Sequence, residues 1–329
     1  MSKSTYWRFA IGVMFSVVCG SAAATAVKAE HYAELVIQGK QAAQHQLHED
    51  AEILWQLVAP RLASLPAIEQ AQWWLAQADL LQFEHRFAEA LTALEQVLAL
   101  QQLHEPVYLM QARIALTRDD LARATQACRA LTGYSQIDVV ATCLLEVKGR
   151  AGQLESSYTR LQQLHWRNGN STEALQQWRL QILAEQAHLL GRYSEALEWL
   201  DYPNYFQQPE VMQRQMLDIL LQTGRAAEVL ALSGVCPKVD ALPSDSLLVR
   251  VAYAEAQLGE QQCWREVTAQ RMHLRELRAD ALHTADIAYY FSYVAPDGEK
   301  ARYWAKQNMA VAQEPFDKQL LAAAQELAL

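Results

Sequence analysis

Apolar residues between positions 74 and 97 recur at the i, i+3, i+4, i+7 spacing of amphipathic helices. The large ones would fill the seam between two antiparallel helices, and the alanines would let the two backbones approach closely. The large residues are Trp74, Leu81, Phe87 and Leu94, and the small ones are Ala78 and Ala90. This segment therefore predicts a helical hairpin.

The same pattern recurs after 34 positions. Residues Trp74, Ala78, Leu81, Phe87, Ala90, Leu94 and Val97 are echoed by Tyr108, Ala112, Ala115, Leu121, Ala124, Cys128 and Leu131. A third unit carries Leu145, Leu154, Ser157, Leu161 and Leu164, and a fourth carries Ala184, Ala187, Tyr193, Ala196 and Leu200. The added residues between these two units fall in the turn cluster at 166–170, followed by Ser171 and Thr172 as candidate N-caps. We expect the added residues to lengthen a loop or a helix start and to leave the stack uninterrupted.

Weaker units follow around Leu217, Ala252 and Ala288, and an initial hairpin is expected around Trp55. Glycines recur at the break between paired helices, where a residue that tolerates positive φ can end the first helix. These are Gly191, Gly224 and Gly259. Asp119 and Asp120 are interpreted as a helix start. A final helix is expected after Pro315.

The 34-residue period and the residues that repeat resemble the tetratricopeptide repeat. The resemblance covers nearly all of residues 30–329, although Ala mostly replaces the Gly of that family's eighth position. It implies an all-α fold, a right-handed α-solenoid of about seven to eight hairpins. The repeat array would span residues 30–315 and a C-terminal capping helix residues 316–329. The family's concave groove binds peptides or proteins.

The composition agrees with a helical array, since 51% of residues are hydrophobic while Gly (12) and Pro (9) are scarce. A fold dominated by β-sheet is therefore not expected. The formal charge is −9. Removing residues 1–29 would take away Lys3, Arg8 and Lys28 and leave 25 basic against 37 acidic residues, or −12. With no basic cluster interleaved with aromatics, nucleic acid is excluded as a partner.

Residues 1–29 have the features of a signal peptide: a basic start, an apolar run from Phe9 to Val18 and a small-residue tail. This predicts export, most simply to a bacterial periplasm, with cleavage preferred after Ala29. Lipidation at Cys19 is not expected because Val18 precedes it. The alternative is an uncleaved inner-membrane anchor facing the periplasm, which would be the chain's only membrane contact.

The chain carries no G-x-S-x-G, H-E-x-x-H, P-loop or dinucleotide-binding motif, so we expect no enzyme activity and no cofactor. His45-x-x-His48-Glu49 is the best metal candidate, but it lacks a closed ligand set and falls at a probable turn, so no metal site is assigned. Of the tandem tryptophans, Trp74 occupies a core position of the repeat, and Trp73 is expected to lie elsewhere.

The resemblance also implies a partner-binding face, formed by fixed positions of each first helix. The residues at these positions mix both charges with aromatic and apolar side chains. They are Gln72, Leu75, Asp79, Gln82, Phe83, Leu109, Arg113, Glu146, Arg150, Trp178, Glu185, His188, Arg214, Asp218 and Tyr253. The Lys/Asn/Arg clamp that some members use for C-terminal carboxylates is missing, so recognition of chaperone tails is not implied.

Four cysteines would remain after cleavage, and an oxidising compartment favours pairing. Cys128 and Cys143 lie at equal distances from the turn at residues 135–136, so we expect them at the same height of an antiparallel pair and joined by a disulfide. Cys236 and Cys263 are expected to be harder to join, because a helix of about 15 residues separates their ends by roughly 22 Å. Whether they pair is left open.

The sequence thus favours a non-catalytic periplasmic scaffold or adaptor that holds a protein or peptide in its groove. The alternative is a helical binding protein that captures a glycan or a metal. Several exposed aromatics at sugar-stacking distance would favour a glycan, and a broad mixed-charge surface would favour a protein.

Overall fold

The computed structural model describes residues 31–32, 45–167, 171–236, 242–259, 263–278 and 281–327. Within these ranges the chain is all-α, with helices and no named β-strand. The first part comprises α2 (His45–Val58), η1 (Ala59–Ser64), α3 (Ala67–Phe83), α4 (Phe87–Ala99), α5 (His104–Thr117), α6 (Leu121–Ala130), α7 (Ile137–Arg150), α8 (Leu154–Arg167), α9 (Glu173–Leu189) and α10 (Tyr193–Trp199). The second part comprises η2 (Tyr202–Gln207), α11 (Glu210–Gln222), α12 (Ala226–Ser233), α13 (Asp245–Leu258), α14 (Cys263–Arg278), η4 (Ala281–His283), α15 (Thr284–Tyr289), the π-helical turn η5 (Tyr290–Val294), α16 (Gly298–Val311) and α17 (Pro315–Glu326).

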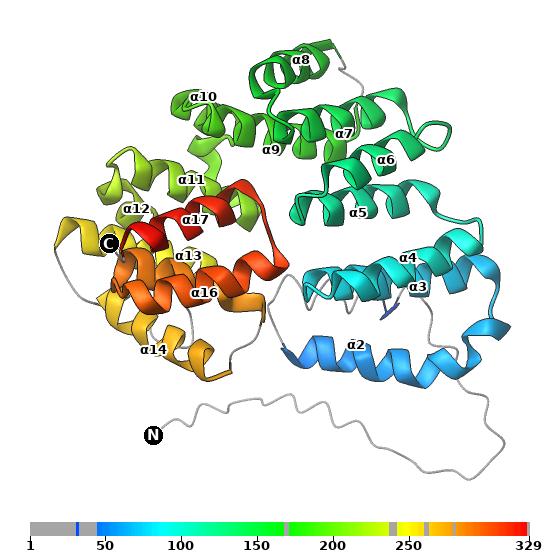
Figure 1. Cartoon of the computed structure of the whole chain (residues 1–329), viewed down its shortest axis with the longest axis horizontal. Helices are drawn as coiled ribbons and strands as arrows, with labels where there is room; N and C mark the ends of the chain where they lie inside the picture. Colours follow the sequence, from blue (N-terminus) through cyan, green and yellow to red (C-terminus); the bar gives the residue numbers. More distant parts are fainter. Residues whose placement is uncertain are drawn as a thin grey trace, which may run out of the picture.

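Consecutive helices pack in pairs, α3 on α4, α5 on α6, α7 on α8 and α9 on α10, and each pair also contacts the next. Figure 1 shows the pairs following one another from α2 through α9 and on to α14. No pair could bury both of its faces alone, so stacking of neighbours supplies the core. This arrangement fits an α-solenoid in general terms.

The predicted seam of the first clear hairpin is buried. Ala78, Ala90 and Leu94 are fully buried, and Leu81 and Phe87 are nearly so. The next pair repeats the arrangement with Ala112, Ala115, Ala124, Cys128 and Leu131. The periodicity of the sequence therefore identified the helix faces that form the core.

The predicted helix ends are also present. Asp120 is the N-cap of α6 and accepts a hydrogen bond from the Arg123 amide. Thr172 caps α9 through its hydroxyl oxygen, which accepts from the Leu175 amide. Gly191, Gly224 and Gly259 all have positive φ, as a break between paired helices requires. Of the predicted turn cluster at 166–170, Trp166 and Arg167 instead end α8, and residues 168–170 lie outside the described residues.

Trp74 packs against the core between α3 and α4, as predicted, although it keeps partial exposure and meets Trp55 edge-on at 4.9 Å. Trp73 lies in a second core on the other side of α3, where it is fully buried and stacks on Tyr32 with centroids 4.5 Å apart. The burial of Trp73 was not predicted, because the repeat pattern describes only the seam between α3 and α4. Our expectation of a turn at His45 and His48 was wrong, since both lie at the start of α2.

The C-terminal helices return to the middle of the array. The Gln313 amide donates to the Thr117 carbonyl oxygen at 2.7 Å, and Lys318 Nζ lies 2.6 Å from an Asp119 carboxylate oxygen. Val311 packs against the core formed by α3, α4 and α5. In Figure 1 the connection between α16 and α17 accordingly reaches toward the end of α5. The helix after Pro315 was predicted, but this contact across about 200 residues was not.

Two disulfides join neighbouring helical pairs. Cys128 and Cys143 are bonded with Cα atoms 5.5 Å apart, as the position of their turn predicts. Cys236 and Cys263 are also bonded, with Cα atoms 6.2 Å apart, which corrects our expectation that they are harder to join. That expectation counted the length of the helix but not the reach of the connection from Cys236 to Ser244, which is eight Cα–Cα steps long. Fully extended, it reaches about 26 Å, enough to follow the length of α13.

None of the helices within the described ranges is long and apolar enough to cross a membrane. The segment of residues 1–29 lies outside those ranges.

Candidate inner-face binding surface

The first helices of successive pairs touch one another directly. These contacts run through α3, α5, α7 and α9, and again through α11, α13 and α15. His188 on α9 lies 2.7 Å from Gln222 on α11, which links the two series. Equivalent positions of the first helices therefore form one continuous surface, here called the inner face. All the predicted partner-binding residues lie on these helices.

The N-terminal part of the inner face is the most accessible. Arg113 on α5 is exposed, and Gln72, Leu75 and Gln82 on α3 are partly exposed. Leu109 packs one side against the α5–α7 core and also keeps partial exposure. Asp79 and Phe83 are partly exposed too and already have interactions of their own. Amide, apolar and cationic groups thus lie together on α3 and α5.

A polar network occupies the centre of the inner face. Trp178 Nε1 donates to the Glu146 carboxylate at 3.2 Å, and Arg150 Nη1 donates to Glu185 at 2.9 Å. Burial raises the pKa of Glu146 to about 7, with Glu185 adding to the rise while Arg113 and Arg150 oppose it. Such a carboxyl group exchanges a proton near neutral pH.

The C-terminal segment adds another carboxylate to this network. Burial raises the pKa of Glu185, the Arg150 guanidinium opposes the rise, and the Glu314 carboxylate adds to it. Glu314 is the N-cap of α17, in a capping box with Asp317. Glu314, at the start of α17, therefore lies within electrostatic range of Glu185 on the inner face of α9.

The last part of the inner face is used for internal packing. Arg250 on α13 is 1% exposed and makes a bidentate ion pair with Asp218 on α11, at 2.7 and 2.9 Å. Its guanidinium also lies over the Phe316 ring of α17, 5.2 Å from the centroid. Tyr253 packs against Tyr293 with centroids 5.1 Å apart. Arg214 is near enough to Asp317 to oppose the rise in the pKa of that carboxyl group, which burial causes.

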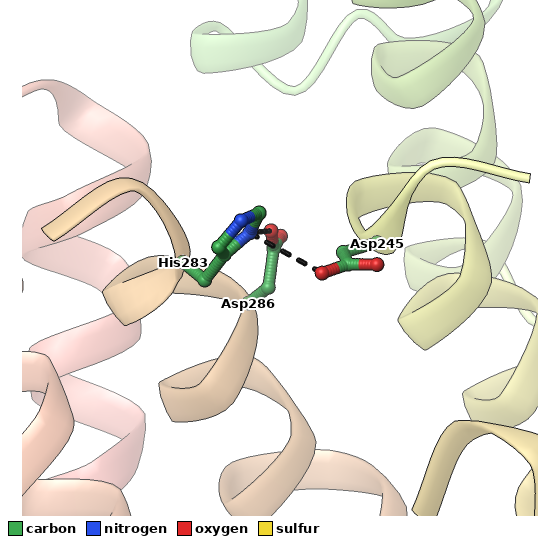
Figure 2. A group of neighbouring side chains, drawn as sticks. All are labelled: Asp245, His283 and Asp286. Carbon is green, nitrogen blue, oxygen red and sulfur yellow. Dashed lines mark ion pairs between the residues drawn. The ribbon is translucent and has the colours of Figure 1, made fainter. Parts of the chain in front are cut away.

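The structure brings together one group with metal-ligand chemistry that the sequence did not reveal. Asp245, His283 and Asp286 converge from α13 and the start of α15 (Figure 2). His283 Nδ1 lies 3.2 Å from Asp245 and 3.8 Å from Asp286. However, Arg275 and Arg271 also contact Asp245, at 2.5 and 3.3 Å. Two guanidinium groups on one carboxylate neutralise it and repel a cation, so the group is a structural ion-pair cluster.

Compared with known proteins, the chain matches no family model, and no curated protein matches it. The tetratricopeptide resemblance therefore rests on the repeated residues themselves. The Glu314 contact and the Asp245 cluster gave no signal in the helical pattern, because each joins residues from elements far apart in the sequence.

Proposed function

We propose that this chain is a non-catalytic scaffold or adaptor that binds a protein or peptide through its inner face. In this proposal the fold is a right-handed array of seven to eight tetratricopeptide-like hairpins. The observation that carries it is the direct contact of α3, α5, α7 and α9, which makes a continuous surface from equivalent positions. Mixed charge with apolar and aromatic groups on such a surface is typical of protein interfaces.

Binding is proposed for the part of this surface that extends from α3 to α9. Arg113 is its exposed cation, and the half-buried Glu146 lies within electrostatic range. Farther along, Asp218 and Tyr253 interact with the protein's own buried groups. The C-terminal segment also packs there, through Phe316 over Arg250, and it reaches the C-terminal end of α5 at Thr117, so a partner would enter from the α3 side.

The glycan and metal alternatives have less support. Trp178 donates to Glu146 and packs against two cores, and Tyr253 packs on other tyrosines, so these rings do not form an open stacking platform. The Asp245 cluster is neutralised by arginines.

A charge reversal at Arg113 tests the inner-face proposal. Purified chain lacking residues 1–29 would be used to capture partners from envelope extract, followed by elution at moderate salt. We expect Arg113→Glu to lose the eluted partner, because reversal places a second negative charge beside Glu146. Arg129→Glu, an exposed arginine on α6, is the matched control and should retain capture. Equal capture by both variants, with unchanged helical circular dichroism, would rule out this face.

Export to the periplasm is part of the proposal. The two disulfides support it, because oxidising compartments favour such bonds. Mass spectrometry of the mature protein should find a new N-terminus between Val27 and His31. An intact Met1 in the membrane fraction would instead support the uncleaved anchor.

A further inference from the structure

A second surface lies on the opposite side of α7 from the polar network. A groove of about 310 Å³ opens between α7 and α8. Its apolar lining includes Leu144, Leu145 and Leu164, and its basic lining is Lys148, Arg160 and Arg167. At about 100° per residue, the mean direction of Leu144 and Lys148 is roughly 160° away from that of Glu146 and Arg150. The groove is therefore separate from the inner face.

The three cations of this groove have no acidic partner in the part of the chain that the structure describes. No acidic residue lines the groove, and none of the three makes an ion pair with any residue in the described ranges. All three are exposed. By contrast, two arginines that directly precede second helices are paired, Arg86 with Glu89 at 2.6 Å and Arg225 with Glu228 at 2.6 Å. In a chain of formal charge −9, this uncompensated positive cluster stands out.

We propose that the α7–α8 groove is a docking site for an acidic amphipathic helix of a partner protein. The half-buried Leu144 and Leu164, between cations with no described acidic partner, complement a ligand that presents apolar side chains together with carboxylates. Arg160 and Arg167 are seven residues apart on α8, which separates them by about 10.5 Å along the axis. Two carboxylates seven residues apart on a ligand helix match that spacing.

This proposal goes beyond binding at the inner face and does not depend on it. An inner-face partner would depend on Arg113, whereas a ligand in the groove would depend on Lys148 and Arg160. The two sites are separated by the thickness of α7, so both could be occupied at once.

The test uses a labelled synthetic helical peptide of about 15 residues, with Glu at i and i+7 and Leu at i+3 and i+4. Fluorescence anisotropy would measure its binding to the full mature chain. We expect saturable binding that weakens several-fold between 20 and 200 mM salt, because the partly exposed charges are screened. Lys148→Glu with Arg160→Glu should weaken it at least tenfold. Arg278→Glu with Lys306→Glu, two exposed cations elsewhere, should leave it unchanged.

Three results would overturn the proposal. The first is absence of binding to the unmodified chain. The second is a loss of charge dependence. It would appear as a peptide with Lys in place of Glu that binds as tightly as the acidic peptide, or as an acidic peptide that binds the Lys148→Glu/Arg160→Glu variant as tightly as the unmodified chain. The third is groove-dependent binding of phosphatidylglycerol vesicles without peptide binding, which would identify a membrane surface as the occupant. Arg113→Glu should not alter peptide binding, so failure here is distinguishable from failure of the inner-face proposal.

Discussion

The ion pair between Asp218 and Arg250 allows the roles of inner-face residues in binding and in stability to be separated. The Arg250 guanidinium is buried, with Asp218 as its acidic partner at 2.7 and 2.9 Å. It also donates to the Ser246 carbonyl oxygen at 2.6 Å and lies 4.8 Å from the Tyr289 ring centroid. Asp218→Leu would leave this cation without its carboxylate. We therefore expect a defect in folding stability rather than in binding alone.

The size of the stability loss expected for Asp218→Leu follows from the burial of the Arg250 charge. Removing one partner of a buried, hydrogen-bonded ion pair costs about 3–5 kcal/mol, because the remaining charge stays desolvated. Ring contacts with Tyr289 and Phe316 compensate for only part of this, at about 0.5–2 kcal/mol per cation–π pair. Replacing both charges by apolar residues of similar size is often close to neutral. Asp218→Leu with Arg250→Met should therefore be more stable than Asp218→Leu alone.

Urea unfolding followed by circular dichroism would give the stabilities of the two single variants and the double variant. Because helical arrays can unfold in parts, hydrogen exchange should accompany it. We expect Asp218→Leu to lower the protection of α13 and α17, since Phe316 packs over the guanidinium. The control is Glu155→Ala, which removes the partner of Arg192 in an exposed pair at 2.6 Å. This loss should cost about 0–1 kcal/mol.

Two outcomes would refute this reasoning. One is a cost for Asp218→Leu no larger than that for Glu155→Ala. The other is a double variant no more stable than Asp218→Leu, which would mean that the buried charge is not the source of the defect. If Asp218→Leu kept its stability but lost partner capture, Asp218 would instead be assigned to the binding surface.

Three further predictions follow from the same structure. Because burial raises the pKa of Glu146 from 4.5 to about 7, the folded state keeps a proton between these pH values that the unfolded chain has lost, and stability falls as pH rises from about 4.5 to about 7. Glu146→Gln should therefore raise the free energy of unfolding by on the order of 1–2 kcal/mol at pH 8, after discounting for partial exposure, and by little at pH 4. Equal shifts of the urea midpoint at the two pH values would contradict this. Non-reducing peptide mapping should find Cys236 linked to Cys263, and alkylation of both as free thiols in oxidised protein would disprove the bond. Lys318→Glu should increase amide exchange across residues 311–318 by repelling Asp119, with little change in the urea midpoint; unchanged exchange would show that this pair does not hold the segment.

The hairpins could be predicted because their packing is local in sequence. Ala78, Ala90 and Leu94 identify the seam between adjacent helices, and all three are buried. Helix ends could be predicted for the same reason, since Thr172 needs only the amide three residues later. The period of the apolar pattern therefore specified the helix pairs and the order in which they stack.

The contacts between distant elements that complete the inner face could not be predicted from the period of the apolar pattern. Glu314 lies near Glu185 because of the path of the whole array, and a helical period contains no information about that path. The burial of Trp73 was missed for a related reason: its neighbour Tyr32 is 41 residues away and precedes the first hairpin that the pattern identified. The pairing of Cys236 with Cys263 stayed open at the sequence level, because the length of the helix between them was counted and the reach of the connection was not.

The two proposed surfaces differ in how their charges are balanced. On the inner face, Arg150 is paired with Glu185 and Arg250 with Asp218, so a partner must compete with internal partners or use the exposed Arg113. In the α7–α8 groove, Lys148 and Arg160 have no described acidic partner to displace. A ligand carboxylate there gains attraction without breaking an existing pair, and association should therefore be faster and more sensitive to salt than at the inner face.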